Sequence, residues 1–304
     1  MREERALSLS ILVPTFNRAG SLKRLLESVE SVEYSDSVSV ELLVIDNGST
    51  DETGKFLIDE QRKPRRLPLT VLKETRKGKS SALNRGLQVA KGKILFLLDD
   101  DVVVHAKWLA GHLQCYDSTT FDAIQGKVLP GVDPQGRPAD PSRLREYNIP
   151  IRDLGEKIRK IRGSIGTNMS LKREVFEKVG LFDPRLGPGA SGFSEDTEYC
   201  IRIRKAGFEI GYTPQAIVYH ELDPARYGRA YNRLSHYRQG VSRSIYRRKS
   251  IVFSVLPNLL TNCIRLGLYK AFGRSQKAYR TEGRILKYWG YLGGRLRRRA
   301  RQGP

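Results

Sequence analysis

The stretch ILFLLDDDVVV, residues 94–104, places three consecutive aspartates between two short apolar runs. Apolar runs this short, bounded by Gly92 and by the acidic cluster, predict a buried strand. Three carboxylates at the end of a buried strand repel one another, and each is costly to remove from water. A divalent cation bound by carboxylate oxygens would relieve that repulsion, and a phosphate-bearing substrate often completes its coordination. A solvated acidic turn is the alternative that these residues alone leave open.

Polar residues also follow the other predicted strands of the N-terminal half. Strand patterns cover residues 9–13, 41–45 and 69–72, and helical patterns cover 22–29 and 80–90. Strands that alternate with helices predict an α/β fold, with a Rossmann-like and mostly parallel sheet flanked by helices. Ligands of such sheets bind outside the carboxyl ends of the strands, where we expect Pro14, Thr15, Asp46 and Asp99 to lie.

A set of segments spread along the chain carries a more specific pattern. In chain order they are PTFNR (14–18), DNGSTD (46–51), GKSSALNRG (78–86), DDD (99–101), GTNMSLKREVFEKVGLFDPRLGPG (166–189), SEDTEYCIRIRKAGFEIGYTP (194–214) and the strand-like run from Ala216 to His220. Together they resemble glycosyltransferase family 2, with its GT-A fold, over roughly residues 8–240. The resemblance implies an inverting hexosyltransferase with a nucleotide-sugar donor, UDP-sugar first, acting in polysaccharide, glycolipid or cell-envelope glycan synthesis.

The resemblance assigns the nucleotide to the first two segments. Asp46 would accept hydrogen bonds from the base or from ribose hydroxyls, and Pro14, Thr15 and Asn17 would line the same region. An Asp-Asn-Gly sequence is also a common strand-to-helix turn, and such a turn would itself present the carboxylate.

The same resemblance assigns the diphosphate and the cation. Gly78 would let the backbone approach the donor, and Lys79 would offer a positive charge to the phosphates, although an exposed lysine is the structural alternative. Asp99 and Asp101 form a D-x-D motif that would bind Mn²⁺ or Mg²⁺, and Asp100 would contact sugar or ribose hydroxyls or point away.

A late histidine completes the implied metal site. Neutral imidazole is a competent ligand for Mn²⁺, so the resemblance makes His220 a third contact to the metal or the diphosphate. A single histidine is more often structural, and that alternative stays open on the sequence alone.

The implied catalytic base lies in the Glu-Asp pair. Asp196 would deprotonate the acceptor hydroxyl, and Glu195 would position the acceptor. Ser194 is expected to cap the helix that follows, and two acids in a first helical turn also fit the helix dipole without any catalytic role. A single displacement with such a base predicts inversion at the anomeric carbon.

Two departures from the family's synthases predict transfer of one sugar per encounter. Leu83 stands where many members of the family have an arginine, and the Gly-Lys form of this segment resembles that of the polysaccharide synthases, yet the chain contains no Gln-x-x-Arg-Trp sequence, which those processive enzymes carry. We also expect none of the several membrane-spanning helices of those enzymes.

The positive charge is concentrated at the C-terminal end. From residue 221 onward there are 20 Lys and Arg against 3 acids, out of a net charge of +21 for the chain. We therefore predict a catalytic domain over residues 1–240 and a basic helical C-terminal region over 241–304. Within it, residues 251–272 are apolar but interrupted by Pro257 and Arg265, so the stretch is expected to fall short of a spanning helix and to lie in a membrane surface.

The last part of that region resembles an anchor at a membrane interface. Tyr288, Trp289 and Tyr291 precede a basic run from Arg295 to Arg301, a composition that attracts anionic lipid. A helical cap on the catalytic domain with a solvated tail is the alternative.

Partners and location follow from what the chain contains. Cys115, Cys200 and Cys263 are far apart, as expected in a reducing compartment, and MREERALSLS has no apolar leader segment. We therefore expect a cytoplasmic protein, peripheral at the inner face of the cytoplasmic membrane, with a glycan or lipid-linked acceptor. Basic charge alone is sequence-neutral, so no specific nucleic acid is predicted. A catalytically inactive sugar- or nucleic-acid-binding protein is the alternative function.

Overall fold

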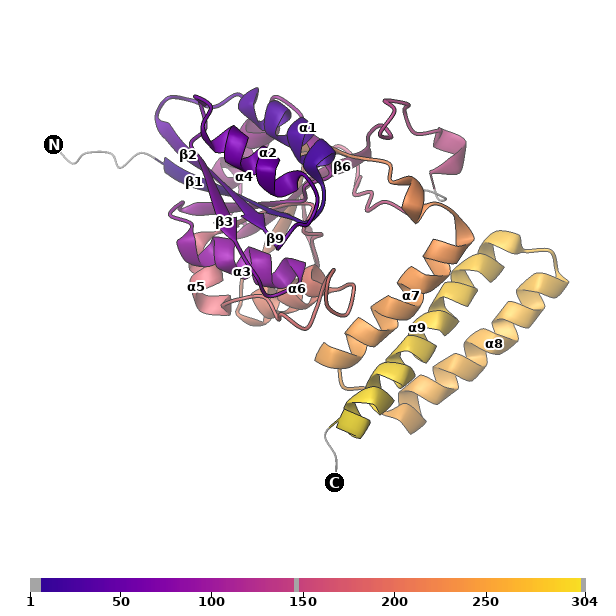
Figure 1. Ribbon diagram of the computed structural model, residues 1–304. Helices are drawn as coiled ribbons and strands as arrows, with labels where there is room; N and C mark the ends of the chain where they lie inside the picture. The colour runs from indigo at the N-terminus through magenta and orange to yellow at the C-terminus, as the bar shows by residue number, and fades with distance from the viewer. Residues whose placement is uncertain (1–6, 145–147, 302–304) are drawn as a thin grey trace.

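The computed structural model describes residues 7–144 and 148–301 (Figure 1). Residues 1–6, the start of the stretch from which we expected no leader segment, lie outside the described residues. The side chains of residues 299–301 are also outside the description. The strands are β1 (Leu7–Thr15), β2 (Val38–Asp46), β3 (Leu69–Lys73), β4 (Ile94–Leu98), β5 (Val102–Val104), β6 (Ala123–Pro130), β7 (Arg159–Ile161), β8 (Asn168–Lys172) and β9 (Ile210–His220).

These strands form one mixed sheet in the order β3-β2-β1-β4-β8-β6-β9-β5, with β7 paired to β9. The first four in this order run parallel, β8 is antiparallel to both β4 and β6, and β6 and β9 are parallel. The α/β fold predicted from the sequence is therefore confirmed, and its strictly parallel part is the N-terminal half.

Helices cover both faces of the sheet (Figure 1). They are α1 (Ala19–Glu30), α2 (Thr53–Gln61) and α4 (Trp108–Ser118) on one face, and α3 (Lys79–Val89), α5 (Arg173–Val179) and α6 (Glu195–Lys205) on the other. Each face has its own apolar cluster, and β4 contributes to both: Phe96 and Leu98 to one, Leu95 and Leu97 to the other. Successive side chains of a strand point to opposite faces, which is why the predicted strand is continuously apolar and fully buried.

Pairing register brings the polar strand ends to one edge. Thr15 of β1 is the register partner of Asp46 of β2, and Asp99 directly follows β4. At the far side of the sheet, β5 runs antiparallel to β9 with Val102 opposite His220. The turn between β4 and β5 therefore holds all three aspartates beside the end of β9.

Three further helices form a layer beside this α/β unit (Figure 1): α7 (Gly228–Tyr246), α8 (Leu256–Ala271) and α9 (Ser275–Arg301). Short helical turns cover Pro141–Arg143 (η1), Pro224–Arg226 (η2) and Ile251–Val255 (η3, a π-helical turn). In the layer α9 lies between α7 and α8. The boundary placed at residue 240 falls inside α7.

Two expectations about this layer were wrong. Together η3 and α8 make one helix, Ile251–Ala271, that is long and apolar enough to cross a membrane by length and composition. Pro257 does not end it: the chain winds as a π-helical turn over Ile251–Val255 just before the proline and continues as α8 after it. Tyr291 is no interfacial anchor: it is 2% exposed, and its hydroxyl accepts from Lys249 N and donates to the Arg247 carbonyl.

Candidate active site

Asp99, Asp101 and His220 form a group that could hold a metal ion. One potential ligand atom of each residue lies within 4.8 Å of the other two. Asp101 and His220 are buried, and Asp99 is half-buried. Two carboxylates and an imidazole are a ligand set suited to Mn²⁺ or Mg²⁺. The three residues that the sequence assigned to the metal are thus brought together.

The orientation of the His220 ring leaves one nitrogen available to a metal. Its Nδ1 lies 2.8 Å from the carbonyl oxygen of Glu221, which can only accept, so Nδ1 carries the proton. The other nitrogen, Nε2, faces Asp101 Oδ1 at 3.4 Å. A backbone carbonyl that fixes the imidazole tautomer in this way is typical of metal-binding histidines.

Lys79 is the direct partner of Asp99. Its Nζ forms an ion pair with Asp99 Oδ1, and Thr167 donates to Oδ2 at 2.7 Å. Burial alone would raise the pKa of Asp99, but Lys79, Thr167 and His220 together outweigh burial and lower the pKa to about 2. Likewise, burial would lower the pKa of Lys79, yet Asp99 and Glu195 raise it. Both groups are therefore charged at neutral pH.

Asp100 points away from the metal group and toward β1. Its Oδ2 accepts a hydrogen bond from Thr15 Oγ1 at 2.7 Å. Burial and the neighbouring Asp101 raise the pKa of Asp100 to about 7. Thr15 and Asp100 thus meet at the edge where the sequence placed the base and ribose.

Two arginines that the sequence analysis did not single out neutralise Asp101. Arg18 Nη1 and Arg226 Nη2 each lie 3.4 Å from Asp101 Oδ2, and both arginines also reach Asp223. Arg18 closes the PTFNR segment and could have been suspected, whereas Arg226 follows β9 in a segment with no distinctive pattern.

The two segments to which the resemblance assigned the nucleotide are hydrogen-bonded to each other. Asn17, with a positive φ of 53°, accepts a hydrogen bond from Thr50 N at 2.7 Å, and its own N donates to Ser49 Oγ. Asp46 is buried and accepts from Ser49 N at 2.9 Å. Asn17 therefore holds two loops together, and Asp46 presents its carboxylate from the predicted turn.

Glu195 and Asp196 begin α6, and Lys79 contacts Glu195 as well as Asp99. Glu195 Oε1 lies 3.7 Å from Lys79 Nζ. Burial and Asp196 raise the pKa of Glu195 to about 7, and burial raises the pKa of Asp196 above its ordinary value. Asp196 is the more accessible of the two acids, and its Oδ1 accepts from Thr197 N at 2.5 Å.

The expected cap of α6 is absent from the structure. Ser194 makes no side-chain cap hydrogen bond, because its left-handed backbone conformation (φ 76°) turns the side chain away from the start of the helix. This conformation is uncommon for residues with a side chain, and the loop before it also has positive φ at Gly187, Gly189 and Gly192.

This loop, residues 187–194, lies directly on the Gly78–Lys79 turn. The carbonyl of Pro188 accepts from Lys79 N at 3.0 Å, and a Cβ on Gly189 would lie 2.7 Å from Gly78 Cα. On its other side, Ser191 Oγ lies 2.8 Å from Ser242 Oγ of α7. Gly78 (φ 122°) thus allows close approach of this loop.

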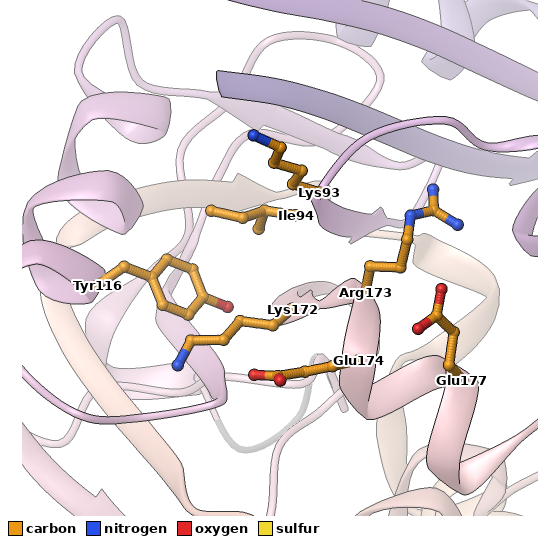
Figure 2. Close-up of a pocket in the computed structure, with 7 residues that line it drawn as sticks. All are labelled: Lys93, Ile94, Tyr116, Lys172, Arg173, Glu174 and Glu177. Carbon is orange, nitrogen blue, oxygen red and sulfur yellow. The ribbon is translucent and has the colours of Figure 1, made fainter. Parts of the chain in front are cut away.

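A separate pocket of about 400 Å³ opens at the other end of β4 (Figure 2). It lies between Ile94 at the start of the strand, Tyr116 of α4 and Arg173 of α5. None of the predicted site residues lines it, so it is no part of the candidate site.

Comparison with known proteins agrees with this geometry. A sequence model of the family described as Glycosyl transferase family 2 matches residues 10–180. Glycosyltransferase AglE of Haloferax volcanii is 26% identical over 71% of this chain and 67% of its own length. The glucosyl-dolichyl phosphate glucuronosyltransferase of that organism is 25% identical over 71% of this chain and 70% of its own.

A solved structure shares the fold. The mannosyltransferase PcManGT from Pyrobaculum calidifontis, in complex with GDP-Man and Mn²⁺, matches with a TM-score of 0.64 at 20% identity. The match covers 94% of this chain and 86% of that one, and so includes the C-terminal helices in large part.

Proposed function

Since the chain belongs to glycosyltransferase family 2, we propose that it transfers one sugar per encounter from a nucleoside-diphosphate donor to a hydroxyl acceptor, with inversion at the anomeric carbon. UDP-sugar is the first donor to test. The α/β unit within residues 1–240 would catalyse the transfer, and the helices after it would have a role other than catalysis.

One observation carries the proposal: a single lysine joins the two acidic groups. Lys79 contacts Asp99 of the metal group and lies 3.7 Å from Glu195 of the acidic pair. A donor whose diphosphate lies at Asp99 and Asp101 would therefore present its sugar within reach of the acids of α6. Displacement of a nucleoside diphosphate needs this arrangement, with positive charge at the leaving group and a base at the nucleophile.

The residues at the metal group fit a hard divalent cation. Asp99 and Asp101 offer oxygen ligands, and His220 offers the lone pair of Nε2 because its Nδ1–H is engaged by the Glu221 carbonyl. When bound there, Mn²⁺ or Mg²⁺ supplies positive charge that stabilises the departing diphosphate. Lys79, Arg18 and Arg226 add cationic side chains around the same carboxylates.

In the proposed reaction Asp196 takes the proton of the acceptor hydroxyl. The acceptor oxygen forms the new bond to the anomeric carbon as the bond to the diphosphate oxygen breaks, so the configuration inverts. Asp196 suits this role better than Glu195, because it is the more accessible and Glu195 is held beside Lys79. The raised pKa of each acid brings it closer to neutral pH, where proton acceptance is most effective.

The acceptor is proposed from the relatives. A glucuronosyltransferase acting on glucosyl-dolichyl phosphate is similar over most of this chain, which favours a lipid-linked glycan in cell-envelope synthesis. A soluble glycan with the same terminal hydroxyl would satisfy the same chemistry.

The proposal is tested by calorimetry with UDP, GDP and dTDP, each in Mn²⁺ and again in EDTA. We expect one nucleotide to bind with Mn²⁺ and to lose its affinity in EDTA, and the sugar nucleotides of that base are then screened for transfer. A folded protein that binds none of the three, or binds one equally well in EDTA, would contradict the proposed donor site.

A further inference from the structure

The outermost helix of the C-terminal layer exposes a continuous apolar face. From Phe253 onward its members recur every three or four residues along η3, α8 and the C-cap of α8, and the exposed fractions run from 47% for Leu256 to 88% for Phe253. We call them the η3–α8 apolar face: Val252, Phe253, Leu256, Leu260, Ile264, Leu268 and Phe272. Scattered exposed apolar residues are ordinary, but a contiguous stripe of this length indicates a binding surface.

The residues that the structure describes do not cover this face. Val255, Leu259 and Asn262 on the other side of the helix are buried, and within the described residues α8 packs chiefly on α9. Figure 1 shows α8 at the outer edge of the layer, with α9 between it and α7. The η3–α8 apolar face therefore points away from the protein.

The charges around this face are almost all positive. Residues 241–304 contain 16 Lys and Arg and one acid, Glu282, which is paired with Arg229 and Arg233 of α7. Exposed basic residues precede the face, lie within its helix and follow it: Arg247, Arg248, Arg265, Lys270, Arg274 and Lys277. An apolar stripe bordered by cations is complementary to a surface that is apolar inside and anionic at its boundary.

We propose that the η3–α8 apolar face docks the protein onto an anionic lipid bilayer, with the helix lying in the plane of the membrane surface. Phe253 and the leucines enter the acyl boundary, and the flanking lysines and arginines contact anionic headgroups. The proposal depends on neither the donor nor the transfer reaction.

An in-plane orientation fits the structure better than a spanning one. The helix Ile251–Ala271 has the length to span, but it contains Arg265 and Lys270 and lies along α9. The neighbouring α9 carries Arg280, Arg284 and Lys287, which a spanning arrangement would draw into the hydrocarbon. Docking of two copies through this face is disfavoured because it would bring two strongly positive surfaces together.

The first test is sedimentation of the full-length protein with vesicles of phosphatidylglycerol and phosphatidylcholine, compared with vesicles of phosphatidylcholine alone. We expect binding to the anionic vesicles that weakens as salt is raised. The double variant Leu260→Ser/Ile264→Ser should lower the partition coefficient at least tenfold. The control is Ile58→Ser, an exposed isoleucine on α2 (49%, against 57% for Ile264), which should bind like the wild type.

The second test measures depth. Leu260→Trp places an indole at an exposed position in the middle of Ile251–Ala271, where an in-plane helix and a spanning helix would hold it at different depths, and the wild-type signal from Trp108 and Trp289 is subtracted. We expect a blue-shifted emission with anionic vesicles and quenching by lipids brominated near the headgroup end of the acyl chain. Thermal unfolding of each variant checks that it is folded, and none of these readouts requires transferase activity.

Three results would overturn the proposal. They are equal binding by the wild type and the double variant, quenching of the Leu260→Trp indole only by lipids brominated at the bilayer centre, and self-association through the face without vesicle binding. The second result would instead indicate a spanning helix, and the third an interface between copies of this chain.

Discussion

Nε2 of His220 lies 3.4 Å from Oδ1 of Asp101, and the two residues meet because β5 pairs antiparallel with β9. The pairing also gives Glu221 N a hydrogen bond to the Asp101 carbonyl at 2.8 Å, so the backbone fixes the spacing of the two side chains. Strand pairing holds Asp101 beside His220, and Lys79 holds Asp99. The metal group is therefore already formed before any ligand binds. Such preorganisation favours binding, since little ordering remains to be done.

Asp101→Asn should abolish metal-dependent nucleotide binding. The substitution keeps the size of the side chain but removes the charge that faces His220, Arg18 and Arg226. Loss of a direct ligand should weaken Mn²⁺-dependent binding by at least about 100-fold, measured by calorimetry. Asp117→Asn, an exposed aspartate on α4, is the control and should leave binding unchanged. Unchanged affinity in the Asp101 variant would remove it from the metal site.

Asp196→Asn should leave nucleotide binding intact and lower kcat by about 10²- to 10⁴-fold, because it removes the base but preserves shape. Glu195→Gln should reduce kcat less and raise KM for the acceptor, since it positions rather than accepts the proton. Steady-state kinetics with the donor saturating separates the two. Near-normal turnover by Asp196→Asn would transfer the role of base to Glu195.

The pH profile should move when Lys79 is replaced. Lys79 lowers the pKa of both Glu195 and Asp196, so Lys79→Met should raise both pKa values. Because the base must be ionised, kcat falls as pH drops through its pKa, and the acidic limb should shift to higher pH in the variant. Lys77→Met, an exposed neighbour, controls for charge in the same loop and should leave the limb in place. If the acidic limb lies at the same pH in both variants, Lys79 does not influence the pKa of the catalytic base.

Gly189→Ala should disturb the loop at residues 187–194 more than its backbone conformation alone predicts. Gly189 and Gly180 both have positive φ, 82° and 79°, but only at Gly189 would a Cβ meet backbone, at 2.7 Å from Gly78 Cα. Both variants should lose about 1–2 kcal/mol of stability from the left-handed conformation. Only Gly189→Ala should also lower kcat/KM, by at least about tenfold, or about 1.4 kcal/mol. Equal activity of the two variants would show that the contact with Gly78 is dispensable.

The parts of the fold that could be predicted from the sequence are those set by local pattern. The run from Ile94 to Leu98 is apolar at every position because both faces of β4 are covered, and this alone located the strand and its acidic end. The polar ends of β1 and β2 followed from the alternation of strands and helices. The metal role of His220 came from the family resemblance.

The parts that were missed depend on contacts distant in the chain. Arg226 reaches Asp101 only through the turn after β9, and Thr167 reaches Asp99 only because β8 runs antiparallel to β4. The cap predicted at Ser194 failed because a left-handed backbone, invisible in the residue type, redirects the side chain. Tyr291 was misplaced because an amphipathic pattern does not reveal which aromatic residue faces a neighbouring helix.

Ser191 and Ser242 join the loop at residues 187–194 to α7, while Gly189 packs closely against Gly78. One short segment therefore has the helical layer on one side and the Gly78–Lys79 turn on the other. A small molecule that wedged α7 away from this loop would inhibit without resembling a nucleotide or a sugar. Because α7 lies outside the residues matched by the family model, such a compound would exploit a part of the chain where selectivity between relatives is easier to achieve.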